Sequence, residues 1–215
     1  MYRLMKSGLA VLAAAALLAA PAGAQTRLDR EGTVGLCAFG DYATLTGESR
    51  FGLDFKSGGG YGINIRYTLN PHWSLGLTFH NQTYGAVRDV KSQGVEKLVS
   101  TEVVGEAYFY RDRDVDAAQY AVLGIGFYRP EVHYTDEDVL YPGENVILTA
   151  GLGVEVFLRE NWGLDLSARG LGYLGEGYAD QERETAAAAG TPITPQGSFA
   201  VGLQVQAGII YYLTR

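Results

Sequence analysis

The chain has 215 residues, which is enough for one domain, and a formal net charge of −7. Only 19% of its residues are charged and none of them form a basic stretch, so the composition offers no surface for nucleic acid. Cys37 is the one cysteine, which excludes an internal disulfide. We expect it to pack as an ordinary strand residue.

The first residues predict an export signal. Arg3 and Lys6 give a positive start, residues 9–20 form an apolar core, and Pro21 ends it. Small residues follow up to Ala24, the expected cleavage site, so residues 1–24 are interpreted as a signal peptide and 25–215 as the mature domain. An uncleaved membrane anchor is the alternative, and the shortness of the apolar core argues against it.

Alternation of apolar and polar residues predicts strands along the rest of the chain. Residues 61–69 place Tyr, Ile, Ile, Tyr and Leu on one face and Gly, Asn, Arg and Thr on the other, and residues 73–79 repeat the pattern. Asn70 and Pro71 make a tight turn between them. The same period, loosest in the first case, predicts strands at 32–42, 98–110, 120–127, 148–158, 162–169 and 197–213.

The connections between these strands alternate in length. Polar stretches interpreted as long loops cover 43–59, 81–96, 129–144 and 172–196, and short turns cover 70–71, 111–116 and 159–161. This alternation is typical of transmembrane barrels, whose short turns and termini lie on the periplasmic side. We therefore predict an all-β fold: a closed antiparallel transmembrane β-barrel of about eight strands with up-and-down topology.

The last strand carries the pattern furthest. Every second residue from Phe199 to Leu213 is apolar or aromatic, and most residues between them are small or polar. About twelve steps of ~3.3 Å at a tilt of ~40° rise roughly 30 Å, the height of a bilayer's apolar band with its interfaces. We predict a membrane-spanning strand that closes the barrel. A long edge strand of a soluble sandwich is the alternative.

Lysines and large aromatic residues also favour a membrane. Beyond the signal peptide, lysine occurs only at Lys56, Lys91 and Lys97, in or beside predicted loops, whereas a soluble barrel uses lysine freely on its outward positions. Four aromatic residues lie close to a short turn or to the C-terminus, as expected of an interfacial girdle: Tyr67, Trp73, Trp162 and Tyr211.

The closing strand resembles the last strand of Gram-negative outer-membrane β-barrel proteins. In that family the barrel-assembly machinery recognises this strand. Gln206, Gly208, Tyr211 and Leu213 fall on the polar, glycine, aromatic and final apolar positions of that pattern. The end differs, because the family usually stops at a terminal Phe and this chain continues to Arg215.

With its signal peptide and eight alternating strands, the chain is similar to the small barrels of the OmpX and OmpA transmembrane-domain type, also described as porin-family outer-membrane proteins. The resemblance implies a location in the outer membrane. It implies contact with membrane lipid, lipopolysaccharide and the barrel-assembly machinery, with a surface ligand reached through the loops as a further partner. It also implies a role in envelope integrity, in surface interaction, or in passage of very small solutes. We expect a monomer without a cofactor.

The polar face predicts a charged interior. In the hairpin around residues 159–161, Glu155 faces Asp165 inside the barrel, about 5 Å away. Two carboxylates this close do not both stay ionised without a cation. We predict a salt-bridged plug in which four acids meet two arginines and at least one acid holds or shares a proton. Its members are Arg66, Glu102, Glu106, Glu155, Asp165 and Arg169.

Other functions remain open alternatives. A small-solute pore needs hydrated interior charges. A lipid A-modifying enzyme needs a nucleophile and a base near the outer leaflet, but His72 lies at a periplasmic turn, His80 faces the lumen and His133 has no adjacent serine. A soluble lipocalin-like periplasmic binder would turn the apolar face inward.

An acidic loop offers one candidate cation site, at Tyr134, Asp136, Glu137 and Asp138. A solvated acidic loop fits the spacing better. We therefore expect no catalytic residue and no metal site.

Overall fold

The structure is a computed structural model that describes residues 31–47, 54–91, 94–111, 116–135, 139–140, 145–175 and 199–213. Predictions about the signal peptide, the 172–196 loop beyond residue 175 and the acidic residues at 136–138 lie outside these ranges. Within them, no helix is long and apolar enough to cross a membrane. The elements are β1 (Val34–Gly47), β2 (Phe55–Asn70), β3 (Trp73–Ala86), α3 (Arg88–Lys91), β4 (Val95–Tyr110), β5 (Ala117–Tyr134), β6 (Val139–Leu140), β7 (Asn145–Arg159), β8 (Trp162–Leu174) and β9 (Phe199–Leu213).

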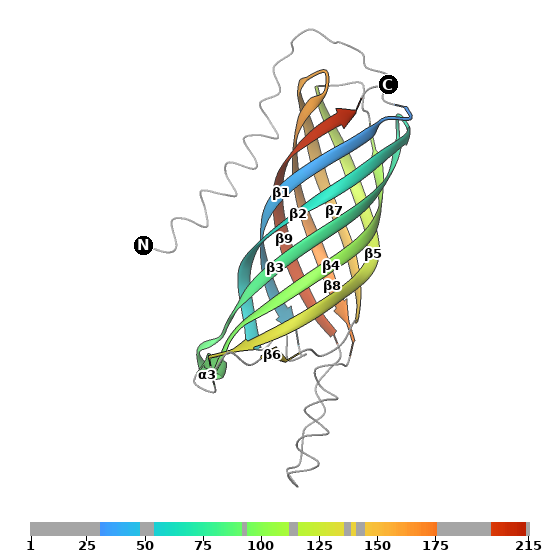
Figure 1. Ribbon diagram of the computed structural model, residues 1–215. Coiled ribbons are helices and arrows are strands. Elements are labelled where there is room, and N and C mark those ends of the chain that lie inside the picture. Colours follow the sequence, from blue (N-terminus) through green and yellow to red (C-terminus); the bar gives the residue numbers. More distant parts are fainter. Residues whose placement is uncertain are drawn as a thin grey trace.

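Eight of these strands form a closed barrel (Figure 1). Each pairs antiparallel with its neighbours along the chain, β1 pairs with β9, and β4 with β5, so no long strand has a free edge. The two-residue β6 only extends β5 at one end. The predicted all-β, up-and-down barrel of eight strands is confirmed.

The strands are strongly staggered. Following directly paired residues once around the barrel, from Tyr120 through every strand in turn, returns to β5 at Pro130, ten residues further along. A stagger of this kind tilts the strands against the barrel axis, as Figure 1 shows. Side chains far apart in a flat drawing of the sheet are therefore brought to the same height.

Several strands extend further than the alternation predicts. β1 continues to Gly47, β3 to Ala86 and β5 to Tyr134, so parts of the predicted loops 43–59, 81–96 and 129–144 are strand. In these extensions the pattern inverts: Val132 is fully buried, while Glu131 and His133 beside it are partly exposed. A strand that has left the lipid no longer needs an apolar outer face, which is why the lipid-type pattern stops before the strand does.

The two faces of the barrel are the reverse of those of a soluble one. Large apolar residues point outward and are exposed, among them Ile63 at 53%, Leu123 at 56% and Leu203 at 68%. Arginine, glutamate, asparagine and threonine side chains are buried inside. An apolar outer band around a polar interior suits lipid and does not suit water.

The interior is filled in layers between two ends. The short turns and the end of β9 lie together at one end, drawn at the top of Figure 1, and α3 and β6 lie at the other. We call these the short-turn end and the long-loop end. Tyrosines fill the lumen near the short-turn end, charged residues its middle, and an apolar cluster the long-loop end.

Candidate functional site in the barrel interior

Arg66 is the centre of the charged layer. It projects from β2 across the lumen, donating from Nη2 to Asp165 Oδ2 at 3.0 Å and lying 3.4 Å from Glu155 Oε2 through Nη1. Asp165 and Glu155 are direct partners on β8 and β7, in the register that the hairpin predicts. All three residues are at most 2% exposed. The guanidinium therefore supplies the cation that two facing carboxylates need.

Arg169 forms the second ion pair of this layer. Its Nη1 donates to Glu106 Oε1, and its Nε donates to Ser167 Oγ at 3.2 Å. Glu106 also accepts from Thr78 Oγ1 and from the Tyr108 hydroxyl, each at 2.6 Å. A buried charge is costly unless it is paired and its remaining hydrogen-bonding capacity is used. This network meets both conditions for Glu106.

Tyrosines surround the arginine pair on the side of the short-turn end. Tyr120 donates to Asp165 at 2.7 Å, and Tyr110 and Tyr212 both donate to Glu155. The Arg66 guanidinium lies 3.9 Å from the ring centre of Tyr108, a cation–π contact. The tyrosine hydroxyls thus replace the water that a hydrated channel would supply to these carboxylates.

A glycine makes room for one of these rings. Gly153 on β7 is the direct partner of Tyr120 on β5, and a Cβ at this position would overlap the tyrosine ring and hydroxyl. Gly170 on β8 has no such neighbour, since its nearest atom would be the Ala150 carbonyl oxygen at 3.7 Å. Gly153, on the polar face, is therefore needed by the packing of the plug, whereas Gly170 lies on the outward face.

Glu102 lies apart from the arginines, which corrects its predicted place. It is four residues from Glu106 along β4, toward the long-loop end, and its Oε2 is 3.0 Å from His80 Nδ1. The other ring nitrogen of His80, Nε2, is 2.7 Å from Asp41 Oδ2. Alternation identified the inward face correctly but not the neighbour, because the neighbour depends on the register of β4 with β3, which pairs Glu102 with His80.

Asp41 and His80 are therefore interior residues that the predicted cluster omitted. Asp41 lies on β1 and His80 on β3, and both point inward by the same alternation that placed Glu102. The inward parity of all three was a usable signal. Their convergence was not visible without the register of β1, β3 and β4.

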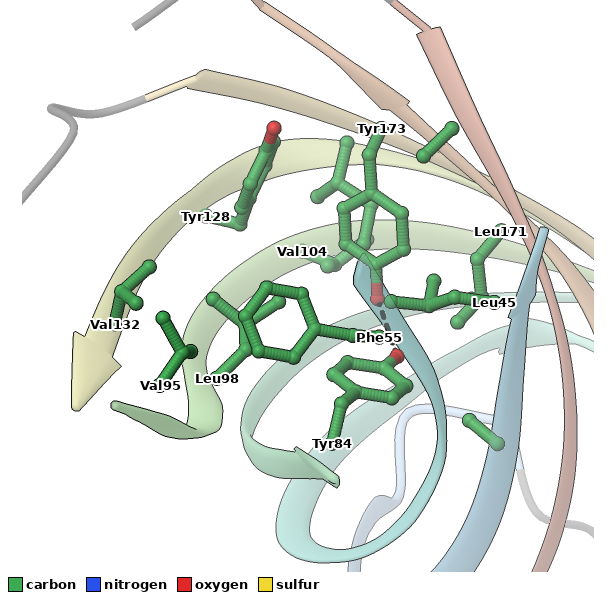
Figure 2. Packing of buried hydrophobic residues seen from close by; sticks show 13 residues of the cluster. Leu45, Phe55, Tyr84, Val95, Leu98, Val104, Tyr128, Val132, Leu171 and Tyr173 are labelled. Carbon is green, nitrogen blue, oxygen red and sulfur yellow. Dashed lines mark hydrogen bonds between the residues drawn. The ribbon is translucent and has the colours of Figure 1, made fainter. Parts of the chain in front are cut away.

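An apolar cap closes the long-loop end (Figure 2). The rings of Phe55, Tyr84 and Tyr173 converge inside the barrel, and the two tyrosine hydroxyls are 2.9 Å apart, joined by the dashed hydrogen bond in the figure. Tyr173 also donates to Glu102 at 2.9 Å, which ties the cap to the charged residues nearer the middle of the barrel. The other members are Ala43, Leu45, Val95, Leu98, Val104, Tyr128, Val132, Ile147, Leu171 and Ala200.

The cap leaves little free space. One void of about 10 Å³ lies among its side chains, including Leu45, Tyr128 and Tyr173. This is close to the smallest volume that holds a single water, roughly 10–15 Å³. A continuous water column through this void would need the cap side chains to move.

The four predicted girdle residues lie on the outer surface near the short-turn end. Trp162 and Tyr211 are direct partners on β8 and β9, with ring centres 4.8 Å apart, and Trp73 packs 3.9 Å from Phe109 on β4. Tyr67, Trp73 and Trp162 are all more than 40% exposed. Apolar rings at this level suit a membrane interface.

The four closing-strand residues divide between the two faces of β9. Gln206 and Gly208 face inward, and Gln206 accepts from Ser167 at 3.2 Å. A Cβ at Gly208 would lie 2.8 Å from the Ala38 carbonyl oxygen and 2.9 Å from Cys37 Sγ. Tyr211 and Leu213 face outward.

The three histidines all contact other polar groups of the chain. Among the described residues, no group of three or more His, Cys, Asp or Glu could hold a metal ion. Both ring nitrogens of His80 face carboxylates, so this histidine has no nitrogen left to activate a nucleophile. His72 contacts the Tyr110 carbonyl, and His133 Nε2 lies 3.8 Å from Glu131 Oε2.

Comparison with known proteins gives a family and several structural relatives. Residues 8–203 match the family described as "Outer membrane protein beta-barrel domain". Neisserial surface protein A (NspA) superposes with a TM-score of 0.58 at 14% identity, over 84% of this chain and 99% of NspA. Ail of Yersinia pestis gives 0.51 at 14% identity over 85% and 99%. OprG of Pseudomonas aeruginosa gives 0.53 at 11% over 88% and 99%.

No curated protein matches the chain in sequence. At these identities the likeness to NspA, Ail and OprG is one of fold alone.

Proposed function

Since the chain belongs to the outer-membrane β-barrel family, we propose that this protein is an integral outer-membrane anchor that displays its long-loop end to the surroundings of the cell and does not conduct solutes. Short turns of such barrels face the periplasm and long loops face outward. The signal peptide, residues 1–24, directs export of the chain before it inserts into the outer membrane. The protein then acts by binding partners at the cell surface through its long loops.

The observation that carries this proposal is the filled lumen. Arg66 and Arg169 hold three carboxylates across the middle of the barrel, and the apolar cap lies between them and the long-loop end. An eight-stranded barrel is just wide enough for side chains to fill its interior. An ion would have to displace both layers to pass.

Planar-bilayer recording tests the proposal. The purified wild type is expected to show no steady conductance, because both layers block the path. The double variant Arg66→Ala with Arg169→Ala should show a higher or intermittent ion conductance than the wild type, because it removes the side chains that fill the middle of the lumen. Large and stable channels in the wild type would make the small-solute pore the correct interpretation.

We also propose that the protein is not an enzyme. His80 has both ring nitrogens on carboxylates, and it lies within the lumen, away from the lipid face that a lipid A-modifying site would need. Incubation of the folded protein with lipid A in mixed micelles should leave its acyl chains and phosphates unchanged by mass spectrometry. Any altered lipid A species that is lost in His133→Gln would contradict this.

A second candidate role is binding of polyanions at the outer rim. Ail of Yersinia pestis has been crystallised with the heparin analogue sucrose octasulfate. Here, Lys97 and Arg129 lie on the outward faces of neighbouring strands β4 and β5, both exposed, close to the long-loop end. The sulfate groups of this ligand and the phosphate groups of lipopolysaccharide are both anions, which such cations bind.

Titration with sucrose octasulfate at low salt tests this role. Lys97→Gln with Arg129→Gln should weaken binding several-fold, and Arg159→Gln at the short-turn end should not change it. Equal binding by all three proteins would exclude this rim as the site.

We further propose that Gln206, Gly208, Tyr211 and Leu213 are the signal that the assembly machinery recognises.

The protein should be a monomer, because closure of the barrel leaves no long strand edge for a second copy.

A further inference from the structure

His80 occupies an unusual position between two carboxylates. Its Nε2 is 2.7 Å from Asp41 Oδ2 on β1, and its Nδ1 is 3.0 Å from Glu102 Oε2 on β4. The three side chains are at most 4% exposed. Neither contact is therefore open to bulk solvent.

With both carboxylates ionised, only one protonation state of the ring satisfies both contacts. A neutral imidazole has one N–H and one lone pair, so one of its nitrogens would face a carboxylate oxygen lone pair to lone pair. The imidazolium donates from both nitrogens. It also carries the positive charge that two buried carboxylates require.

We propose that His80 is an imidazolium that latches β4 and β3 to β1 over the intervening strand β2, and that loss of its second proton releases this latch and loosens the long-loop half of the barrel. This property is separate from the surface role, since it concerns how the interior responds to pH. The latch is closed in acid and neutral solution. Its contribution disappears as the pH rises far enough to remove the proton.

The groups around the latch leave no substitute for the ring. Asp41 and Glu102 are the charged groups that contact it, and no lysine or arginine of the described ranges forms an ion pair with either. Tyr173 on β8 and Ser100 on β4 donate to Glu102, and Tyr84 on β3 bonds to Tyr173, whose ring packs on Tyr128 of β5. Neutral hydroxyls solvate Glu102 but do not balance two negative charges.

Buried polar atoms without a hydrogen-bond partner among the described residues lie close to His80. Asp41 Oδ1 and both amide atoms of Gln82 are buried with no hydrogen-bond partner in the part of the chain that the structure describes. A Cβ on Gly60 would overlap Gln82 Oε1 and lie 2.7 Å from His80 Nε2, so the amide and the ring lie over the same glycine. Asp41 thus has no second donor that would hold it if His80 lost its proton.

The latch also supports the apolar cap. Glu102 accepts from both His80 and Tyr173, and Tyr173 is part of the cap. If Glu102 or Asp41 were released, the hydrogen bonds that position Tyr173, and through it Tyr84, would be lost. We therefore expect the change to be felt at the long-loop end, with the Arg66 layer left intact.

Thermal unfolding of the folded protein in detergent at pH 6 to pH 10 tests the latch, read as loss of the fast-migrating band on unboiled gels. The wild type should lose roughly 5–10 °C of its midpoint at the alkaline end, on the order of the shift a large domain shows for a lost buried contact. His133→Gln is the matched control, since it alters an outer-face histidine, and it should keep the full wild-type drop.

Glu102→Gln separates the latch from other alkaline effects. In this variant a neutral His80 can donate from Nε2 to Asp41 and accept at Nδ1 from the introduced side-chain amide, so both contacts survive without the second proton. The variant should lose most of the alkaline drop while remaining folded. A wild-type drop that persists unchanged in Glu102→Gln would overturn the proposal.

A spectroscopic measurement on the wild type does not depend on the stability of any variant. Nitrogen-15 NMR of the ring-labelled protein at neutral pH should show both nitrogens of His80 protonated, assigned by the absence of the signal in His80→Gln. A neutral His80 ring at neutral pH would refute the latch.

Discussion

Replacing Arg66 by alanine removes the cation at the centre of the lumen. The guanidinium lies 3.0 Å from Asp165 and 3.4 Å from Glu155, and neither carboxylate is more than 2% exposed. Removing one partner of a buried pair leaves an uncompensated charge and costs about 3–5 kcal/mol. For a chain of this size, each kcal/mol shifts the melting midpoint by about 2–4 °C, so we expect the midpoint to fall by roughly 10 °C.

Loss of the folded band on unboiled gels, followed against temperature, measures this shift. Arg159→Ala is the control, since Arg159 is exposed beside a short turn, and it should melt with the wild type. A combined variant, Arg66→Met with Glu155→Gln and Asp165→Asn, removes the charges together and should regain much of the stability. If Arg66→Ala melts within about 2 °C of the wild type, less than one kcal/mol is at stake, the interior charges are hydrated and the plug does not exist.

Four further predictions follow from named residues. Arg169→Ala should also lower the midpoint, because it leaves Glu106 without its ion pair; the same melting assay measures it. Gly153→Ala should destabilise the barrel by pressing a methyl group into the Tyr120 ring, whereas Gly170→Ala should be nearly neutral; the two melting midpoints compared directly decide this. Tyr211→Ala should slow insertion into the outer membrane more than Leu203→Ala, measured by the fraction of heat-modifiable protein in cell envelopes. An epitope inserted near Ala188 should be labelled on intact cells; labelling only after permeabilisation would invert the topology.

The fold could be predicted from the sequence because alternation is directly readable. Each spanning strand has one face in lipid and one in the lumen, so residues such as Ile63 and Asn64 indicate their environments by type alone. The closing strand β9 and the hairpin that pairs Glu155 with Asp165 were predictable for the same reason. Whether a residue faces inward or outward can therefore be assigned from its own strand alone.

Height inside the barrel was not predictable in the same way. Arg66 meets Asp165, 99 residues away, only because eight registers add to a fixed stagger. No local pattern contains that sum. Glu102 is grouped with the arginines on parity alone, whereas the register of β3 and β4 pairs it directly with His80, which also contacts Asp41.

The apolar cap was missed for a different reason. Beyond the lipid, the outer face turns polar while Phe55, Leu98 and Val132 turn inward, so the alternation inverts. A search for the lipid-facing pattern interprets such segments as loops. The inverted pattern of a soluble strand, sought directly after each membrane span, would have found them.

A double-mutant cycle between Arg66 and Asp165 tests the central claim most directly. The claim is that the lumen is held closed by paired charges in a dry interior. Arg66→Met, Asp165→Asn and the double variant should give a coupling free energy of about 2 kcal/mol or more, as for contacting residues in a buried network. A coupling below about 0.5 kcal/mol, the range of independent or solvated sites, would contradict it.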